Sequence, residues 1–227
     1  MNVIVFASRK GGSGKSTMTA HLAAHANRPS RRCMLIDADP QGSISLWHKL
    51  RGTAEPQLRN GTRGGVKEIV EQARADGVEW AFVDTPPNMS AVVEDAIRNA
   101  TMAIIPARPG VFDVNAVQET IQTCRAARKP YAVVVNGAPA ERDGVESRIV
   151  TIAREALAKF RAPVWSGQIT NRADLIMALS QGEGAREYYA EGRAAAEISR
   201  LWGAIERSIK AIRGTASASG TMHKQAA

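Results

Sequence analysis

Five short apolar runs alternate with helix-length segments along this chain, and few folds accommodate such an alternation. None of the runs contains a polar residue; they are Val3–Phe6, Met34–Ile36, Trp80–Val83, Met102–Ile105 and Ala132–Val135. Continuous runs of this kind are typical of strands buried on both faces of a parallel sheet. The intervening segments predict helices at Ser16–Asn27, Val66–Asp76, Ala91–Asn99, Val114–Lys129 and Val145–Phe160. The order predicts an α/β fold, a mostly parallel sheet flanked by helices on both faces.

The remaining segments suit a single domain over residues 1–213. With 227 residues, of which 44% are hydrophobic, the chain can bury one sizeable core. Arg51–Gly65 is rich in Gly, Thr and Arg and is predicted to be a long surface loop. Tyr189–Arg213 predicts a final helix, because its apolar residues recur at helical spacing. Gly214 is expected to end that helix and to leave residues 214–227 as a flexible tail.

A glycine-rich segment joins the first apolar run to the first predicted helix and predicts a phosphate site. Its glycines let backbone amides converge on phosphate oxygens, and the helix directs its N-terminal dipole at the same anion. Lys15 would neutralise the β and γ phosphates, and the Ser16 hydroxyl would ligate Mg²⁺. Arg9 stands where the general pattern has Gly, and a glycine-rich turn with a solvated lysine is the alternative. The residues predicted to bind the nucleotide are Gly11, Gly12, Ser13, Gly14, Lys15, Ser16 and Thr17.

Three boxes in order carry a family resemblance. Lys10–Thr17, with its additional lysine, resembles the deviant Walker A box of the ParA/MinD group of ATPases. Leu35–Ser43 resembles the second box of that family, and Phe82–Pro87 resembles its Walker B box. The similarity covers residues 2–136 and extends more loosely to residue 213.

The resemblance implies a P-loop NTPase fold and an Mg²⁺-dependent ATPase that converts ATP to ADP and phosphate. Within the family the chain looks like the small ParA type of partition protein. Residues 1–8 are expected to leave no room for an added helix-turn-helix domain before the first box.

Three aspartates follow apolar runs and are therefore expected at the carboxyl edge of the sheet, beside the phosphate loop. Carboxylates there can hold Mg²⁺ directly or through water and can orient the water that attacks the γ phosphate. The resemblance implies that Asp39 positions this water, that Asp84 lies outside the direct ligands of Mg²⁺, and that Asp37 supports a metal-bound water. A turn or helix-capping aspartate is the alternative for each.

Two further positions take predicted roles from the resemblance. Asn136 ends the fifth apolar run, where an amide can donate to and accept from an adenine edge; a turn Asn before Gly137 is the alternative. Lys10 is expected to reach the nucleotide of a second molecule in an ATP-bound homodimer, and so to act in catalysis with Lys15 and Asp39. A solvated Lys10 is the alternative.

The charge balance favours an anionic partner. Lys and Arg total 30 against 22 Asp and Glu, a formal net charge of +8. Arg193, Arg200 and Arg207 recur every seven residues on the final helix and therefore stack into one stripe. Arg172 matches the region that carries DNA-contacting residues in ParA relatives. These arginines predict phosphate contacts with little sequence preference, and a solvated basic face is the alternative.

Three classes of function can be compared with these sequence features. The first is a ParA-like ATPase that dimerises on ATP, binds DNA non-specifically and partitions plasmid or chromosome DNA, or positions a protein cluster, with stimulation by a centromere-binding or cargo adaptor protein. The second is a MinD-like positioner whose Ile198–Ile212 stripe lies on a membrane, although packing on the sheet is commoner for such a stripe. The third, an iron–sulfur protein on the same scaffold, is excluded because Cys33 and Cys124 are not placed to hold a cluster.

The sequence also predicts where the protein works. No apolar run approaches the roughly 20 residues that cross a bilayer, and the start lacks the features of a secretory signal. Two cysteines far apart fit a reducing compartment. We therefore expect a cytoplasmic, nucleoid-associated protein without an integral membrane segment.

Overall fold

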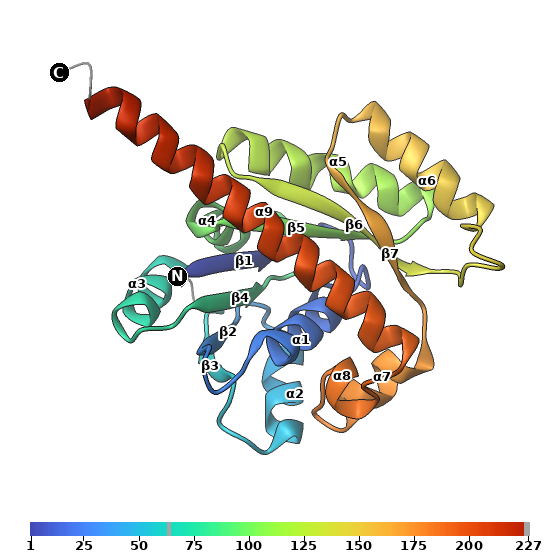
Figure 1. The fold of residues 1–227 in the computed structure, drawn as a ribbon, viewed down its shortest axis with the longest axis horizontal. Helices are drawn as coiled ribbons and strands as arrows, with labels where there is room; N and C mark the ends of the chain where they lie inside the picture. The colour runs from blue at the N-terminus through green and yellow to red at the C-terminus, as the bar shows by residue number, and fades with distance from the viewer. Residues whose placement is uncertain (63–64, 225–227) are drawn as a thin grey trace.

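The computed structural model describes the backbone of residues 1–62 and 65–224 and the side chains of residues 1–62 and 65–214. In this part of the chain, one parallel sheet has the strand order β3-β2-β4-β1-β5-β6-β7 (Figure 1). Its strands are β1 (Asn2–Phe6), β2 (Cys33–Asp37), β3 (Gln57–Asn60), β4 (Trp80–Asp84), β5 (Met102–Ala107), β6 (Tyr131–Ala138) and β7 (Val164–Thr170). The predicted parallel sheet is therefore confirmed.

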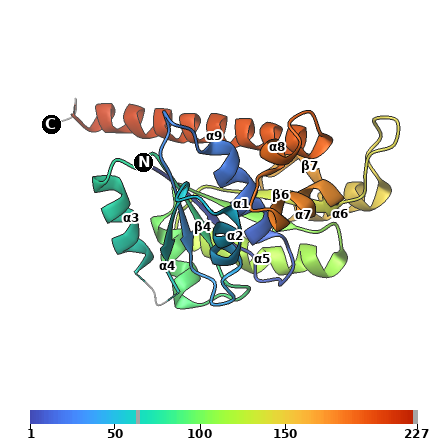
Figure 2. The same ribbon diagram turned by 90° about the horizontal axis from the view of Figure 1, so that it is seen from below.

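Helices cover both faces of the sheet, as Figures 1 and 2 show. One core lies between the sheet and α3 (Val66–Ala75), α4 (Ala91–Asn99), α5 (Val111–Ala126) and α6 (Arg148–Lys159). The other face carries α1 (Lys15–Ala26), α2 (Ser43–Arg51), α7 (Ala173–Ser180), α8 (Ala185–Tyr188) and α9 (Arg193–Lys224).

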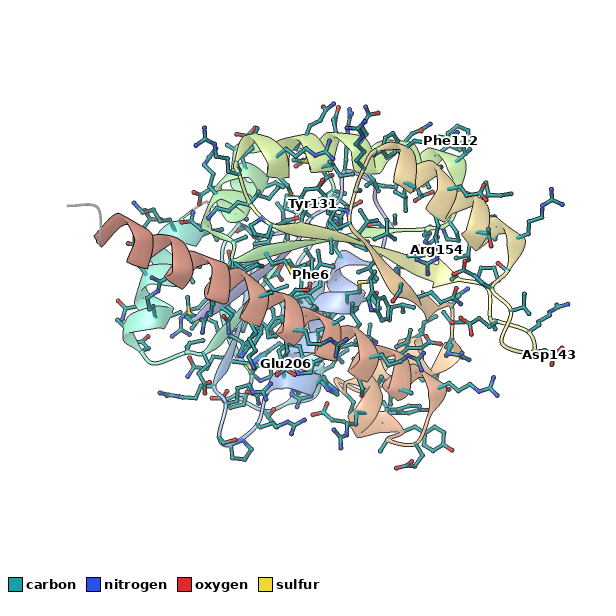
Figure 3. The ribbon with its side chains drawn as sticks, turned by 45° about the horizontal axis from the view of Figure 1, so that its top comes forward. Phe6, Phe112, Tyr131, Asp143, Arg154 and Glu206 are labelled. Atoms are coloured by element: carbon teal, nitrogen blue, oxygen red, sulfur yellow. The ribbon has the colours of Figure 1, made fainter. Side chains whose placement is uncertain are left out.

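The central strand β1 illustrates why the strands read as continuous apolar runs. Val3 and Val5 belong to the core under α3 to α6, whereas Ile4 and Phe6 belong to the opposite core. Figure 3 shows Phe6 in the middle of the molecule and Asp143 at the tip of the loop that follows β6. Because both faces of β1 are buried, neither face selects polar residues.

The parallel register gathers polar residues at one edge. Asp84 at the end of β4 is the register partner of Asp37 in β2 on one side and of Phe6 in β1 on the other. The glycine-rich segment starts just beyond Phe6, so it emerges next to both carboxylates. Asn136 lies near the end of β6 at the same edge.

Two strands were missed by the sequence analysis. The prediction of a continuous loop over Arg51–Gly65 is wrong, because β3 lies within it and pairs with β2 in parallel. Strand β7 pairs with β6 at the opposite edge of the sheet. Edge strands are partly exposed and mix polar with apolar residues, so a search for continuous apolar runs does not detect them.

Helix α9 does not end at Gly214, where its end was predicted. It continues to Lys224, so the predicted start of a tail at residue 214 is wrong. Glycine costs a helix about 1 kcal/mol relative to alanine, and no proline follows to break the helix. Residues 225–227 of the predicted tail lie outside the described residues.

The apolar stripe of α9 packs on the sheet. Its buried members are Ile198, Leu201, Trp202, Ile205 and Ile209. The Trp202 ring lies 4.6 Å from the Trp80 ring, measured between centroids. The stripe on which the membrane-associated alternative depended is thus part of the core. No helix in the described part of the chain combines the length and the apolar character needed to span a membrane.

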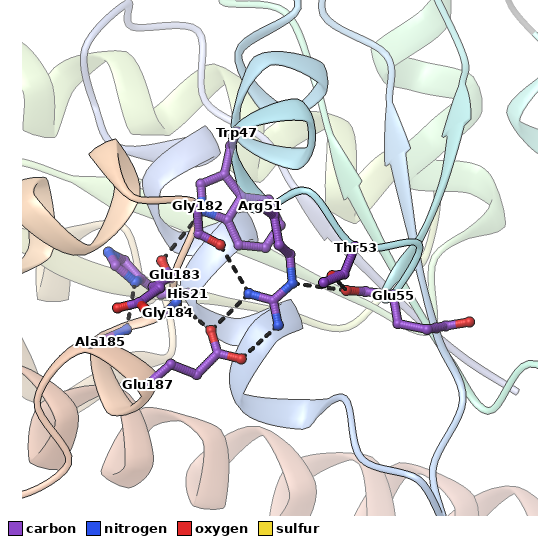
Figure 4. Close-up of polar contacts among 10 residues, drawn as sticks. All are labelled: His21, Trp47, Arg51, Thr53, Glu55, Gly182, Glu183, Gly184, Ala185 and Glu187. Carbon is purple, nitrogen blue, oxygen red and sulfur yellow. Dashed lines mark hydrogen bonds and ion pairs between the residues drawn. The ribbon is translucent and has the colours of Figure 1, made fainter.

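A polar cluster fastens the α7–α8 segment to α1 and α2 (Figure 4). Arg51, at the end of α2, donates hydrogen bonds of 2.8 and 2.6 Å to the carboxylate of Glu187 and one of 3.0 Å to the carbonyl of Gly182. The backbone N–H of Ala185 donates to Nδ1 of His21 in α1 at 3.1 Å. These contacts join residues more than a hundred positions apart and hold α7 beside the carboxyl edge of the sheet.

Candidate functional site

The glycine-rich segment ends in a tight turn at the start of α1. Gly14 stands at the N-cap with a φ of 99°, a left-handed conformation that residues with a Cβ rarely adopt. The side chain of Asn136 donates a 2.6 Å hydrogen bond from Nδ2 to the carbonyl of Ser13. A Cβ on Gly14 would lie 2.0 Å from that Nδ2. The turn is therefore braced from β6, with the α1 N-terminus available to an anion.

A cleft of about 460 Å³ opens at this turn and reaches the segment between β7 and α7. Of the residues predicted to bind nucleotide or act on it, the cleft is lined by Gly11, Gly12, Gly14, Lys15, Ser16, Thr17, Asp39 and Asn136. It is also lined by residues that the sequence analysis did not assign to it: Gln41, Ser43, Pro87, Arg108, Gly137, Thr170, Asn171, Arg172, Leu175 and Ile176. Recognition of β7 as a strand would have pointed to the residues that follow it.

Lys15 is buried in the wall of the cleft, with 6% of its surface exposed. Burial lowers the pKa of its ammonium, and the carboxylates of Asp84 and Asp39 act in the opposite direction. An ammonium held next to the amides of the loop can offset the charge of a phosphate chain without first losing a full hydration shell.

Ser16 and Asp84 form a polar pair below the loop. The Ser16 hydroxyl donates a 2.6 Å hydrogen bond to Oδ2 of Asp84. Burial, opposed by this hydrogen bond and reinforced by the charge of Asp37, raises the pKa of Asp84 to about 7. Among the described residues, the buried Oδ1 of Asp84 finds no hydrogen-bond partner. An oxygen in this state is suited to accept a hydrogen bond from a water on a divalent cation.

The described residues contain no group of three or more His, Cys, Asp or Glu side chains that could hold a metal by itself. A magnesium ion at this site would therefore depend on the Ser16 hydroxyl, water and the phosphates of a nucleotide. That donor set is typical of magnesium, which keeps several waters and binds through substrate phosphates.

The two aspartates after β2 have different surroundings. Oδ2 of Asp37 accepts hydrogen bonds from the Ser45 backbone N–H at 2.8 Å and from the Ser45 hydroxyl at 2.6 Å. These contacts are those of the capping alternative, at the first turn of α2. Asp39 accepts from the Gln41 N–H through Oδ1 at 3.0 Å and lines the cleft. Its Oδ2 makes no hydrogen bond within the described part of the chain.

Lys10 lies outside the cleft lining and is exposed. Its side chain forms no hydrogen bond or ion pair with the residues that the structure describes. The preceding Arg9 pairs with Glu119 of α5, which ties the start of the loop to that helix. Lys10 is therefore an exposed lysine on a loop whose start is tied to α5.

The basic residues predicted to contact DNA fall into two groups. Arg193, Arg200 and Arg207 are exposed on α9. Arg172 instead lines the nucleotide cleft, and its guanidinium donates to Oε1 of Glu197 from Nε at 3.1 Å and from Nη2 at 2.8 Å. The Glu197 contact, which the sequence pattern gave no reason to expect, holds Arg172 half-buried beside Arg193 and Arg200, with which it lines a second cleft.

Comparison with known proteins agrees with this geometry. A family model described as the CobQ/CobB/MinD/ParA nucleotide binding domain matches residues 4–214. Maintenance of carboxysome distribution protein A of Gloeobacter kilaueensis is 33% identical over 120 residues, which are 52% of this chain and 55% of that protein. The chromosome-partitioning ATPase Soj of Thermus thermophilus is 26% identical over 154 residues, 55% of this chain and 62% of Soj. The chain thus spans a little over half the length of these curated relatives.

Solved structures share the fold. The MinD cell division protein of Aquifex aeolicus superimposes with a TM-score of 0.69 at 21% identity, covering 89% of this chain and 98% of MinD. A Cyanothece McdA(D38A)–ATP complex gives a TM-score of 0.68 at 17% identity, covering 94% of this chain and 96% of that one. At these identities the likeness concerns the architecture.

Proposed function

The chain belongs to the CobQ/CobB/MinD/ParA family of nucleotide-binding domains, and on that premise we propose that it is a ParA-like, Mg²⁺-dependent ATPase. In the proposed cycle the protein dimerises on ATP, binds DNA non-specifically and drives the partition or positioning of plasmid or chromosome DNA. A centromere-binding or cargo adaptor protein stimulates hydrolysis. The observation that carries the proposal is the cleft that brings Lys15, Ser16 and Asp39 together at the N-terminus of α1.

The loop amides, Lys15, Ser16 and Asp39 each have a defined task in this proposal. The loop amides and Lys15 bind the β and γ phosphates, and the Ser16 hydroxyl, paired with Asp84, faces the cation site. Magnesium, when bound with ATP, supplies positive charge to the phosphate oxygens. Asp39 accepts a hydrogen bond from the attacking water through its available Oδ2 and so directs the water oxygen toward the γ phosphorus.

ATP binding and hydrolysis test this assignment. We expect Lys15→Ala to abolish nucleotide binding, because the charge that offsets the phosphates is lost. We expect Asp39→Ala to bind ATP but not to hydrolyse it. Asp76→Ala, at the end of α3, removes an exposed aspartate outside the cleft lining and serves as the matched control. Hydrolysis by Asp39→Ala at the parent rate would show that another group positions the water.

The homodimer is proposed from the exposure of Lys10, which can reach a nucleotide in a second molecule. Sedimentation of Asp39→Ala with ATP should show a dimer, and the same variant with Lys10→Ala should remain a monomer. Lys67→Ala removes an exposed lysine of α3 as control. A dimer that forms equally well with ADP, or one indifferent to Lys10, contradicts the proposal.

DNA binding and nucleoid association are proposed from the α9 stripe. Two molecules double the number of phosphate contacts, so dimerisation on ATP raises affinity without changing either surface. Binding of Asp39→Ala with ATP to unrelated duplexes should fall steeply with salt, and Arg200→Ala should flatten that slope. Arg74→Ala removes one exposed charge from the opposite layer and should leave the slope unchanged. Binding that is insensitive to salt contradicts a phosphate-contacting stripe.

The adenine role of Asn136 needs its own test, since Nδ2 already donates to Ser13 and leaves Oδ1 to the base. Asn136→Ala removes Oδ1 together with the bracing Nδ2, and loss of the brace alone should weaken ATP and GTP binding equally. If Asn136 reads the base, the variant should change the preference for ATP over GTP. An unchanged ratio would leave Asn136 with the bracing contact alone.

A second cargo is favoured by one relative. Similarity to a carboxysome distribution protein supports a variant of the proposal in which the same ATPase positions a protein cluster. Adaptors of the two kinds distinguish the cargoes: a centromere-binding protein or a cluster-associated protein should raise the ATPase rate with DNA present. Stimulation by neither argues against both cargoes.

A further inference from the structure

Glu197 is a buried carboxylate on α9 that no predicted role explains. Only 4% of its surface is exposed. Its Oε2 accepts the backbone N–H of Thr170 at 2.8 Å, and its Oε1 accepts the Thr170 hydroxyl at 2.9 Å. The Arg172 guanidinium donates two further hydrogen bonds to Oε1. All four donors come from one short segment, the exit from β7.

Burying a carboxylate is unfavourable unless charge and hydrogen bonds compensate it. Within the described part of the chain, every hydrogen bond to this carboxylate comes from Thr170 or Arg172, so the carboxylate fixes the position of both residues at once. Asn171 between them donates its backbone N–H to the carbonyl of Ala138 in β6 at 2.8 Å. The segment is thereby clamped between α9 and β6.

The clamped segment forms one wall of the nucleotide cleft. Thr170, Asn171 and Arg172 all line it, together with Leu175 from α7. The same cleft includes the proposed phosphate loop at the N-terminus of α1. Thr170–Arg172 are therefore available to the ribose and base of a nucleotide whose phosphates occupy that loop.

The ion pair also separates two spaces. Thr170 and Arg172 also line a second cleft of about 460 Å³, together with Arg193, Glu197 and Arg200 of α9. Without the pair, the wall of the nucleotide cleft would lose its backing and could move into this second space.

We propose that Glu197 is a positioning residue for nucleotide binding: through Thr170 and Arg172 it holds the wall that receives the ribose and base. The inference rests on the proposed nucleotide site. Glu197 does not contact the phosphate loop, Ser16 or Asp39, so its effect is on the affinity of the nucleoside half and not on the hydrolytic step.

The test compares MgATP with Mg-tripolyphosphate, which has the phosphate chain but no nucleoside. Glu197→Gln places an amide donor against groups that are themselves donors. We expect Glu197→Gln to weaken MgATP binding about tenfold, equivalent to about 1.4 kcal/mol. The KM for ATP should rise by a similar factor with little change in kcat. The affinity for tripolyphosphate should stay unchanged. Glu206→Gln is the matched control on α9, because Glu206 pairs with Arg31 instead.

A general loss of structure would weaken both ligands and lower kcat, and this outcome overturns the proposal. Equal ATP affinity in Glu197→Gln and parent overturns it as well. If Glu197→Gln does not fold, Glu197→Asp keeps the charge with a shorter reach and should show the same selective loss at smaller size. A parent protein that binds tripolyphosphate but not ATP refutes the proposed ATP site itself, whereas selective ATP binding unaffected by Glu197 refutes only the positioning role.

Discussion

The close approach of Gly14 and Asn136 predicts strong coupling between two residues 122 positions apart (136 − 14). In Gly14→Ala the new Cβ would lie 2.0 Å from Nδ2 and 3.1 Å from Cγ of Asn136. The alanine must also adopt a φ of 99°. The variant therefore combines an unfavourable backbone conformation with a clash that expels the amide from its contact with Ser13.

The two costs can be separated. A left-handed alanine costs about 1–2 kcal/mol. Displacement of the Asn136 amide breaks its hydrogen bond and leaves the Ser13 carbonyl unsatisfied, at a cost of about 1–3 kcal/mol. Gly14→Ala should therefore lower the free energy of unfolding by about 2–5 kcal/mol in the parent. In an Asn136→Ala background no amide remains to be displaced, and only the backbone cost should persist.

Urea unfolding of the parent, both single variants and the double variant, all without nucleotide, measures this cycle. The coupling energy should be about 1–3 kcal/mol, well above the roughly 0.5 kcal/mol at which independent sites add. If Gly14→Ala costs the same in both backgrounds, Asn136 does not brace the turn.

Other perturbations have equally defined outcomes. Burial lowers the pKa of His21 from 6.5 to about 4. Between these pH values the unfolded chain binds more protons than the folded protein, so the free energy of unfolding falls by up to about 1.4 kcal/mol per pH unit as the pH drops. His21→Gln should therefore make the loss of Tm between pH 6.5 and 4 shallower, and an equal loss in variant and parent contradicts the burial argument. Trp202→Ala empties the contact with the sheet and should cost about 3–5 kcal/mol in urea unfolding, whereas a loss below about 1 kcal/mol would mean that α9 is not part of the core. Gly182→Ala sets a Cβ 2.2 Å from the backbone N of Arg51. It should lower Tm far more than Gly144→Ala, because Gly144 has a comparable φ but open space where its Cβ would lie. Equal losses of Tm would show that backbone strain alone acts at both sites.

The parts of the fold that could be predicted are those buried on both sides. Strands such as β1 and β4 carry no polar residue between their first and last positions, and the alternation of such runs with helix-length segments is sufficient to identify a parallel sheet. Strand β3 reads Gln-Leu-Arg-Asn because its end is exposed, and β7 carries polar residues that face the clefts. Their pairing depends on neighbours far away in the sequence, which no local pattern records.

The candidate site likewise contains a part that the sequence predicts and a part that depends on tertiary structure. The turn at the start of α1 was predictable, because the glycines, Lys15 and Ser16 stand there within a few consecutive residues. Asp37 looked equivalent to Asp39 in sequence, yet a serine one turn into α2 engages its carboxylate. Arg172 looked like a surface arginine, yet an ion pair with Glu197, 25 residues later, holds it half-buried. The wall of the cleft beyond the loop is a product of tertiary structure.

The position of Glu197 in the sequence also determines the order in which the parts of the cleft are synthesised. Lys15 and Glu197 are 182 residues apart (197 − 15), so at 5–20 residues per second the ribosome needs about 10–40 s to pass from one to the other. Throughout that interval a growing chain carries the proposed phosphate loop while the wall at Thr170–Arg172 lacks its clamp. Each new molecule therefore gains the proposed phosphate-binding end of the cleft first and the complete cleft only when α9 is made.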